Sequence, residues 1–119
     1  MKLLTLLFLC HLVGDFCLTS PWMLRAKSTG WPPLPILTHA LVHAVLMGGA
    51  LMICSVPVGQ AFLLAGVEMG SHFLIDTLKG LANSRFPSLG EYKSQISWMV
   101  FGLDQFCHTL VILFIYKYA

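Results

Sequence analysis

The chain has 119 residues, of which 57% are hydrophobic and only 10% charged, and its mean hydropathy is +0.80. Soluble domains usually carry about 25% charged residues, so the composition excludes an ordinary water-soluble domain and favours an integral membrane protein. The formal net charge of +2 comes without a basic patch, so nucleic acid is not an expected partner.

The apolar residues are sufficient for four membrane spans, because each crossing needs about 20 mostly apolar residues. Between the first two spans, Ser20-Pro21 is a helix-start signal and Gly30 to Pro33 is a stop, so a short interfacial helix is expected there. The chain is therefore predicted to be all-α, a single transmembrane domain over residues 1–119. Its four spans are expected at about 2–19, 35–56, 58–81 and 95–116.

Small residues recur on the second and third predicted spans. Ala40, Ala44 and Gly48 lie four residues apart, and Gly66 and Gly70 form a GxxxG motif. Such ridges let helices approach closely in a membrane, and the motif is expected to bring the third span near a packed neighbour. The expected partners are membrane lipids and, through the small-residue faces, a second copy of the chain.

Basic residues are unevenly distributed between the two ends of the predicted bundle. Lys2 and Lys117 lie at one end, and five basic residues lie at the other. The positive-inside rule therefore predicts that both long loops lie in the cytoplasm and both termini outside, although Lys2 argues mildly the other way. The five residues are Arg25, Lys27, Lys79, Arg85 and Lys93.

The third predicted span carries polar residues at helical spacing. Glu68, His72 and Asp76 lie at steps of four, and Lys79 follows three residues later. Because a helix has 3.6 residues per turn, these side chains share one stripe of an otherwise apolar helix. Such a stripe requires polar partners from the other spans.

All five histidines and all three aspartates of the chain fall into pairs at i, i+4 spacing, one pair per predicted span. Chance scattering predicts about half of one such pair. On antiparallel helices, most of these residues share a slab roughly 15 Å thick in the cytoplasmic half of the membrane. The pairs are His11/Asp15, His39/His43, His72/Asp76 and Asp104/His108.

These buried polar groups must be neutralised by each other, by protons or by a cation. An unpaired aspartate at the centre of a membrane helix costs about 2.5–3.5 kcal/mol. Imidazoles and carboxylates on facing helices are the ligands of Zn²⁺ or of paired iron or manganese ions. We therefore expect the eight paired residues to bind one or two divalent metal ions, with zinc ahead of manganese and iron. A metal-free hydrogen-bond network and a proton relay are the alternatives.

Four motifs together resemble domain of unknown function 3307 (DUF3307), over nearly the whole chain. This is a family of small bacterial and phage membrane proteins without an established activity, so the resemblance implies a bacterial inner membrane with periplasmic termini. The third motif is also similar, on one helix, to a segment of predicted membrane-bound metal-dependent hydrolases. The motifs are His11-Leu-Val-Gly-Asp15, His39-Ala-Leu-Val-His43, His72-Phe-Leu-Ile-Asp76 and Asp104-Gln105-Phe-Cys-His108.

The function that these residues indicate is a membrane-embedded metal-dependent hydrolase. The metal would activate a water molecule, and Glu68 or Asp76 would act as the catalytic base. Lys27 and Lys79 would bind the anionic group of a phosphoester or other amphipathic substrate at the cytoplasmic leaflet. The alternatives are a metal-ion or proton transporter, a haem-binding subunit, and a structural membrane protein without enzymatic activity.

Overall fold

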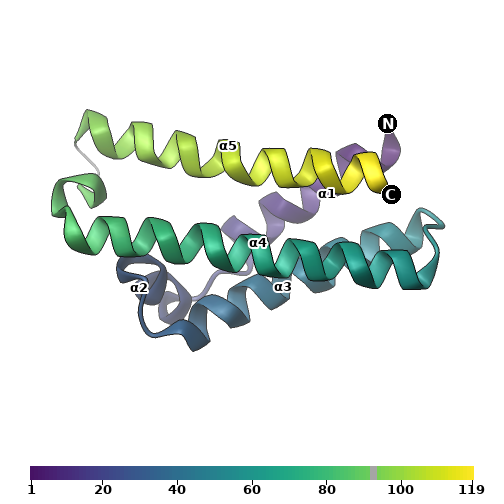
Figure 1. Ribbon diagram of the computed structural model, residues 1–119, viewed down its shortest axis with the longest axis horizontal. Helices are drawn as coiled ribbons and strands as arrows, with labels where there is room; N and C mark the ends of the chain where they lie inside the picture. The colour runs from purple at the N-terminus through teal and green to yellow at the C-terminus, as the bar shows by residue number, and fades with distance from the viewer. Residues whose placement is uncertain (92–93) are drawn as a thin grey trace.

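The computed structural model describes residues 1–91 and 94–119, and these parts of the chain are all-α, as predicted (Figure 1). Three short elements are the π-helical turn η1 (Val13–Cys17), helix α2 (Pro21–Thr29) and the 3-10 turn η2 (Pro87–Gly90). Lys93, one of the predicted cytoplasmic charges, lies outside the described residues. The long helices are α1 (Lys2–Leu12), α3 (Pro33–Ile53), α4 (Val58–Arg85) and α5 (Gln95–Tyr118).

Among the described residues, α3, α4 and α5 are long and apolar enough to cross a membrane. The segment Lys2–Cys17 passes the same test only together with α2, from which it is bent by 96°. The helices therefore provide three spans, or four if the bent pair makes one. The longest dimension of the chain is 44 Å, close to the total thickness of a bilayer with its headgroups, about 40–45 Å.

The two halves of the bundle have different interiors. The termini lie at one end, and α2 and η2 lie at the other (Figure 1). On α4 the apolar core ends at Leu64, and the buried polar residues begin one turn later at Glu68. Nine buried apolar residues fill the half near the termini: Leu7, Met47, Ala50, Leu51, Val56, Ala61, Leu64, Ile112 and Ile115.

The outer surface is apolar along both halves. Leu41, Phe62 and Phe106 are among the many large apolar side chains that the long helices expose. In water such a surface would be costly, whereas lipid tails solvate it well. Polar groups inside and apolar groups outside are the arrangement that a lipid environment stabilises.

The helix ends follow the local sequence signals: three predicted starts match, whereas the start of the second span and all four predicted ends differ by two to four residues. Ser20 caps α2, its Oγ accepting a hydrogen bond from the Met23 amide at 3.3 Å. The first helical segment ends at Cys17, two residues earlier than predicted, and α4 continues to Arg85, four residues beyond the predicted end. Pro87 accounts for the end of α4, because the residue before a proline avoids helical geometry.

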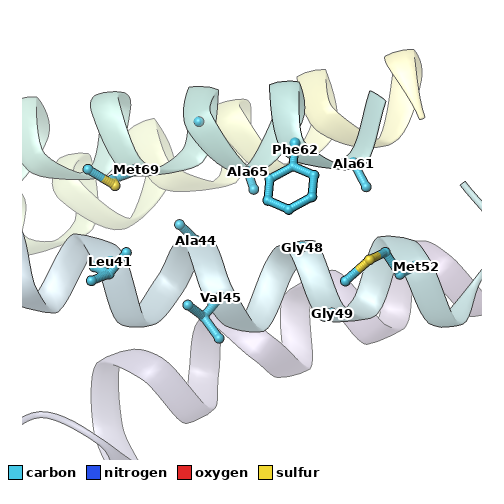
Figure 2. Close-up of a pocket in the computed structure, with 11 residues that line it drawn as sticks. Leu41, Ala44, Val45, Gly48, Gly49, Met52, Ala61, Phe62, Ala65 and Met69 are labelled. Atoms are coloured by element: carbon cyan, nitrogen blue, oxygen red, sulfur yellow. The ribbon is translucent and has the colours of Figure 1, made fainter. Parts of the chain in front are cut away.

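The GxxxG motif does not mediate packing within the chain. A Cβ atom built at Gly66 or Gly70 would meet nothing within 4 Å, so the expectation of a packed neighbour there is wrong for contacts inside this chain. Gly66 instead lines an apolar groove of about 380 Å³ between α3 and α4. Figure 2 shows its walls, with Phe62 and Met69 of α4 facing α3.

Gly80 is the glycine that brings two helices together. A Cβ atom on Gly80 would overlap the backbone of Gly30 and the carbonyl oxygen of Lys27. Since these atoms belong to the last turn and the C-cap of α2, the missing side chain lets α2 end directly against α4. The backbone of Lys27 therefore packs at Gly80, one helical turn after Asp76, and from there its side chain reaches the Asp76 carboxylate.

We predict that Gly80→Ala destabilises the protein by about 1–3 kcal/mol, the usual cost of overpacking a close contact. Gly66→Ala and Gly70→Ala are matched controls on the same helix and are expected to be neutral or to stabilise it by up to about 1 kcal/mol, since alanine favours helix. Thermal unfolding in detergent, followed by circular dichroism, measures all three. Equal stability of Gly80→Ala and the wild type would refute the close approach.

Candidate metal centre

All eight residues of the four predicted pairs meet in one buried network. They come from α1, η1, α3, α4 and α5, and Asp15 is their most connected member. Its Oδ1 lies 3.1 Å from His39 Nε2, 3.2 Å from His43 Nε2 and 3.6 Å from His72 Nε2. Its Oδ2 lies 3.3 Å from His11 Nε2. Four histidines thus surround one carboxylate.

The remaining aspartates extend this network along α4 and α5. Asp76 Oδ2 lies 3.4 Å from His72 Nε2, and Asp76 Oδ1 lies 3.5 Å from His108 Nε2. The same His108 atom lies 3.5 Å from Asp104 Oδ1. The imidazole rings are packed together as well, with ring centroids of His43 and His72 only 3.7 Å apart.

The backbone at the end of the first helix is adapted to this cluster. Asp15 lies in the π-helical turn η1, and such turns are frequent at functional sites because they redirect a side chain. The preceding residue is Gly14, where a Cβ atom would overlap the ring of His43. Helix α3 can therefore place His43 against the backbone of η1 and within reach of Asp15.

Hydrogen bonds alone do not satisfy this set of contacts. Lys27 Nζ donates to His39 Nε2 at 3.1 Å, which leaves that nitrogen without a proton to donate. Yet the same nitrogen lies 3.1 Å from the acceptor Asp15 Oδ1 and 3.2 Å from His72 Nε2. Several lone pairs therefore converge on one small volume around the Lys27 ammonium, an arrangement that could also hold a metal ion.

Six buried polar atoms of the cluster have no hydrogen-bond partner within the described residues, and three of them are Nδ1 atoms of histidines whose Nε2 faces Asp15. Buried polar atoms are seldom left without a partner in hydrogen-bond geometry. A metal-free hydrogen-bond network would thus leave the cluster incompletely satisfied. The six are His11 Nδ1, His39 Nδ1, His43 Nδ1, Asp76 Oδ2, Asp104 Oδ1 and His108 Nε2.

The donor atoms have the spacing of a metal shell. Zn²⁺ binds nitrogen and oxygen at about 2.0–2.2 Å in a tetrahedron, which places neighbouring ligand atoms about 3.3–3.5 Å apart. The observed spacings around Asp15 Oδ1 run from 3.1 to 3.6 Å. Three groups in the described residues could hold an ion: Asp15/His39/His43/His72, His11/His43/Glu68/His72 and His72/Asp76/His108.

The groups overlap, because His72 belongs to all three. One way to seat two ions is to divide six residues into two sets of three, Asp15/His39/His43 and His72/Asp76/His108. Three protein ligands per ion leave a position for water or substrate, as catalytic zinc sites do. Asp104 is in none of the three groups.

Glu68 lies on the apolar side of the cluster and is 2% exposed. Its Oε1 is 3.2 Å from His72 Nδ1 and 3.8 Å from His43 Nδ1, the nitrogens opposite those that face Asp15. A carboxylate in this position fixes the tautomer and orientation of a metal-binding histidine. Glu68 and Asp76, the two predicted bases, are both absent from the lining of the cavity beside the cluster.

That cavity of about 420 Å³ lies between η1, α2, α4 and α5, at the end of the bundle away from the termini. Asp15 and Asp104 line its inner side, and the predicted substrate-binding residues Lys27 and Lys79 line it too. Lys79 Nζ lies 3.1 Å from Asp104 Oδ2. The cluster therefore borders a cavity whose lining carries two lysines and two aspartates.

Several contributing residues were not recognised as site residues in the sequence. Gln105 hydrogen-bonds Asp15 and Asp104 through Nε2 at 3.4 and 3.2 Å, although the i, i+4 pattern does not include it. Its position next to Asp104 was the available signal. Asn83 and Thr19 also line the cavity, but neither belongs to a spaced pattern that could have identified it.

Comparison with known proteins gives one match. The model of the family described as "Protein of unknown function (DUF3307)" matches residues 3–119. Neither the curated proteins nor the solved structures contain a match to the chain.

We predict that Asp15→Asn lowers the stability of the metal-free protein by about 3–5 kcal/mol, the cost of removing one partner from a buried charge network. Thermal unfolding in detergent with a chelator present measures the effect. Glu91→Gln, on an exposed acid of the loop before α5, is the control and should change stability by no more than about 0.5 kcal/mol. If the two variants unfold alike, Asp15 does not organise the cluster.

Proposed function

The chain belongs to the DUF3307 family, and we propose that it is a membrane-embedded metal-dependent hydrolase acting on a phosphoester at the cytoplasmic leaflet. The observation that carries the proposal is the convergence of His39, His43 and His72 on Asp15 Oδ1 at 3.1–3.6 Å, from which three ligands can hold an ion and leave its fourth position to water. Three nitrogens and one oxygen suit Zn²⁺ best, whereas carboxylate-rich shells suit manganese or iron. The candidate ligand groups contain enough residues to bind one or two metal ions.

The shape of the bundle supports a one-sided reaction centre over a transport path. A permeating ion would need polar groups along the whole bundle. Beyond Glu68, however, the interior is filled by the nine-residue apolar core, in which Leu7, Met47 and Ile115 are fully buried. The cavity beside the cluster is lined by residues of η1, α2, α4 and α5, at the opposite end. The polar stripe therefore connects to one side of the bundle.

A haem group fits less well than a small ion. Bis-histidine ligation needs a flat macrocycle between two imidazoles. Here the rings of His43, His72 and His108 are in direct contact, with centroid separations of 3.7 Å and 4.2 Å between neighbours. The aspartates between the rings would also have no role in haem binding.

The residues around the cavity fit distinct steps of hydrolysis. A bound divalent ion supplies an acidified water and polarises a phosphoryl group. Of the two carboxylates that line the cavity, Asp104 is outside every candidate ligand group, so it is the group that we assign as the base. Lys27 and Lys79 bind the phosphoryl oxygens, and Glu68 orients His72.

The position of the cavity suits an amphipathic substrate. It lies at the end of the bundle that carries Arg25 and Arg85, which the positive-inside rule places in the cytoplasm. An apolar outer surface surrounds it, so the tail of a lipid substrate can stay in the membrane while its headgroup reaches the lysines. The proposed location is the bacterial inner membrane.

Protein purified in detergent after growth with zinc is expected to contain one or two zinc ions per chain. The double variant His72→Ala/Asp76→Ala should contain at least one zinc ion per chain fewer than the wild type, because it destroys the His72/Asp76/His108 set and removes a ligand from each of the other two candidate groups. Asp104→Asn is the matched control and should retain the metal. Plasma mass spectrometry measures the content, and a wild-type protein that folds without metal and gains none on dialysis would refute the proposal.

The zinc-loaded protein is expected to release phosphate from phospholipids in mixed micelles, and chelation should abolish the release. Asp104→Asn should lower the rate by about 10²–10⁴-fold, the usual contribution of a general base, while keeping its zinc. A colorimetric phosphate assay measures turnover of phosphomonoester lipids, and mass spectrometry of the released alcohol and phosphomonoester measures turnover of phosphodiester lipids in the same panel. Metal-loaded protein that turns over no member of the panel would contradict hydrolysis of phospholipids.

A further inference from the structure

The ammonium group of Lys27 lies among the donor atoms of the metal centre. Its Nζ is 3.1 Å from His39 Nε2, 3.3 Å from Asp76 Oδ2 and 3.7 Å from Asp15 Oδ1. Asp15 and His39 belong to one candidate ligand group, and Asp76 belongs to another. One lysine therefore contacts the residues of both halves of the centre.

The lysine and a metal ion cannot use these donors together. The ammonium group donates one hydrogen bond to His39 Nε2, and its charge is paired with Asp76 and Asp15, so it occupies lone pairs and negative charge that a metal would also need. Two cations that share one carboxylate oxygen repel each other strongly at separations of about 4 Å. Metal binding therefore requires Lys27 Nζ to move away from the donors.

The cavity is the place to which Lys27 can move. Its side chain is 18% exposed and already lines that space, and a lysine has a flexible four-carbon stem. The backbone of α2 stays fixed against Gly80, so only the side chain needs to change. Lys79 lines the same cavity from α4, with its ammonium on Asp104.

The charges around the cavity decide when an anion can bind. The charged residues in its lining are Lys27 and Lys79, balanced by Asp15 and Asp104. While Lys27 is paired with Asp15, an incoming anion meets no excess of positive charge. A divalent ion on Asp15 reverses this balance, because it neutralises the carboxylate and releases an ammonium group at the same time.

On the basis of the proposed metal centre, we propose that metal binding displaces Lys27 into the cavity and creates there, with Lys79, a binding site for a phosphomonoester anion. The compact ammonium groups suit the oxygens of a tetrahedral anion. Metal and anion then bind with positive coupling, and by linkage each raises the affinity for the other. In the metal-free protein, Lys27 stays paired with Asp15 and Asp76 and is not available to bind an anion.

Zinc affinity gives the first test, by competition with a chromophoric chelator in detergent. Lys27→Gln is expected to bind zinc about 10–100-fold more tightly than the wild type, because the competing charge-assisted hydrogen bonds are gone. Lys79→Gln is the matched control, since Lys79 contacts only Asp104 among the site carboxylates, and its zinc affinity should change less than about 3-fold. A lysine with a merely structural role would give weaker zinc binding when replaced.

Anion affinity gives the second test, by titration calorimetry with inorganic phosphate and, separately, with short-chain phosphatidic acid. Wild-type protein loaded with zinc is expected to bind the anion at least about 10-fold more tightly than protein treated with chelator, and zinc-loaded Lys27→Gln should lose most of this gain. Binding of phosphatidic acid but not of free phosphate identifies the lipid headgroup as the source, and equal binding of both identifies the phosphate group alone.

The outcomes separate this inference from the function on which it rests. No zinc binding by any of the three proteins overturns the metal centre and the coupling with it. Zinc binding by the wild type that Lys27→Gln leaves unchanged or weakens overturns the displacement of Lys27 alone. Lys27→Arg is the control for a folding defect. It keeps the positive charge, so its zinc affinity should be close to the wild-type value, whereas a folding defect caused by replacing Lys27 would change zinc binding in both variants.

Discussion

The burial of ionisable groups inside an apolar bundle is the constraint on which the structure depends. Seven of the eight paired residues fall below one-tenth exposure, and the eighth, Asp15, is buried at its side chain. In a lipid environment such groups are stable only when each lone pair and each charge has a partner. The contacts around His39 Nε2 show that lysine and imidazole hydrogens do not meet that demand. A cation at the centre, as in the proposed metal site, would meet it.

The rest of the fold positions this cluster. The π-helical turn η1 directs Asp15 inward, Gly14 makes room for the ring of His43, and Gly80 lets α2 bring Lys27 to the centre. The apolar core near the termini holds the four helices together and closes one end of the interior. The other end is left open as a cavity lined by two lysines. The apolar core and the polar cluster thus occupy different halves of one small bundle.

Spacing in the sequence identified the helices and the members of the cluster, because chance seldom places histidine and aspartate in i, i+4 pairs along an apolar chain. The same reasoning could not divide the residues among roles. Glu68 and Asp104 are both acids on polar stripes, and only their depth separates the acid that faces His72 Nδ1 from the one that lines the cavity. The tight contact at Gly80 depends on the path of α2 across α4, which no local pattern encodes. The GxxxG motif gave a wrong expectation of helix packing for the same reason, because a motif does not indicate which face of its helix contacts a neighbour.

The most direct test of the metal centre is X-ray absorption at the zinc edge on the purified, zinc-loaded protein in detergent. The structure predicts a first shell of nitrogen and oxygen atoms at about 2.0–2.1 Å, with the outer-shell scattering of two or more imidazole rings. A shell of water oxygens without imidazole scattering, or a sulfur shell at about 2.3 Å, would contradict a centre built from these histidines and aspartates.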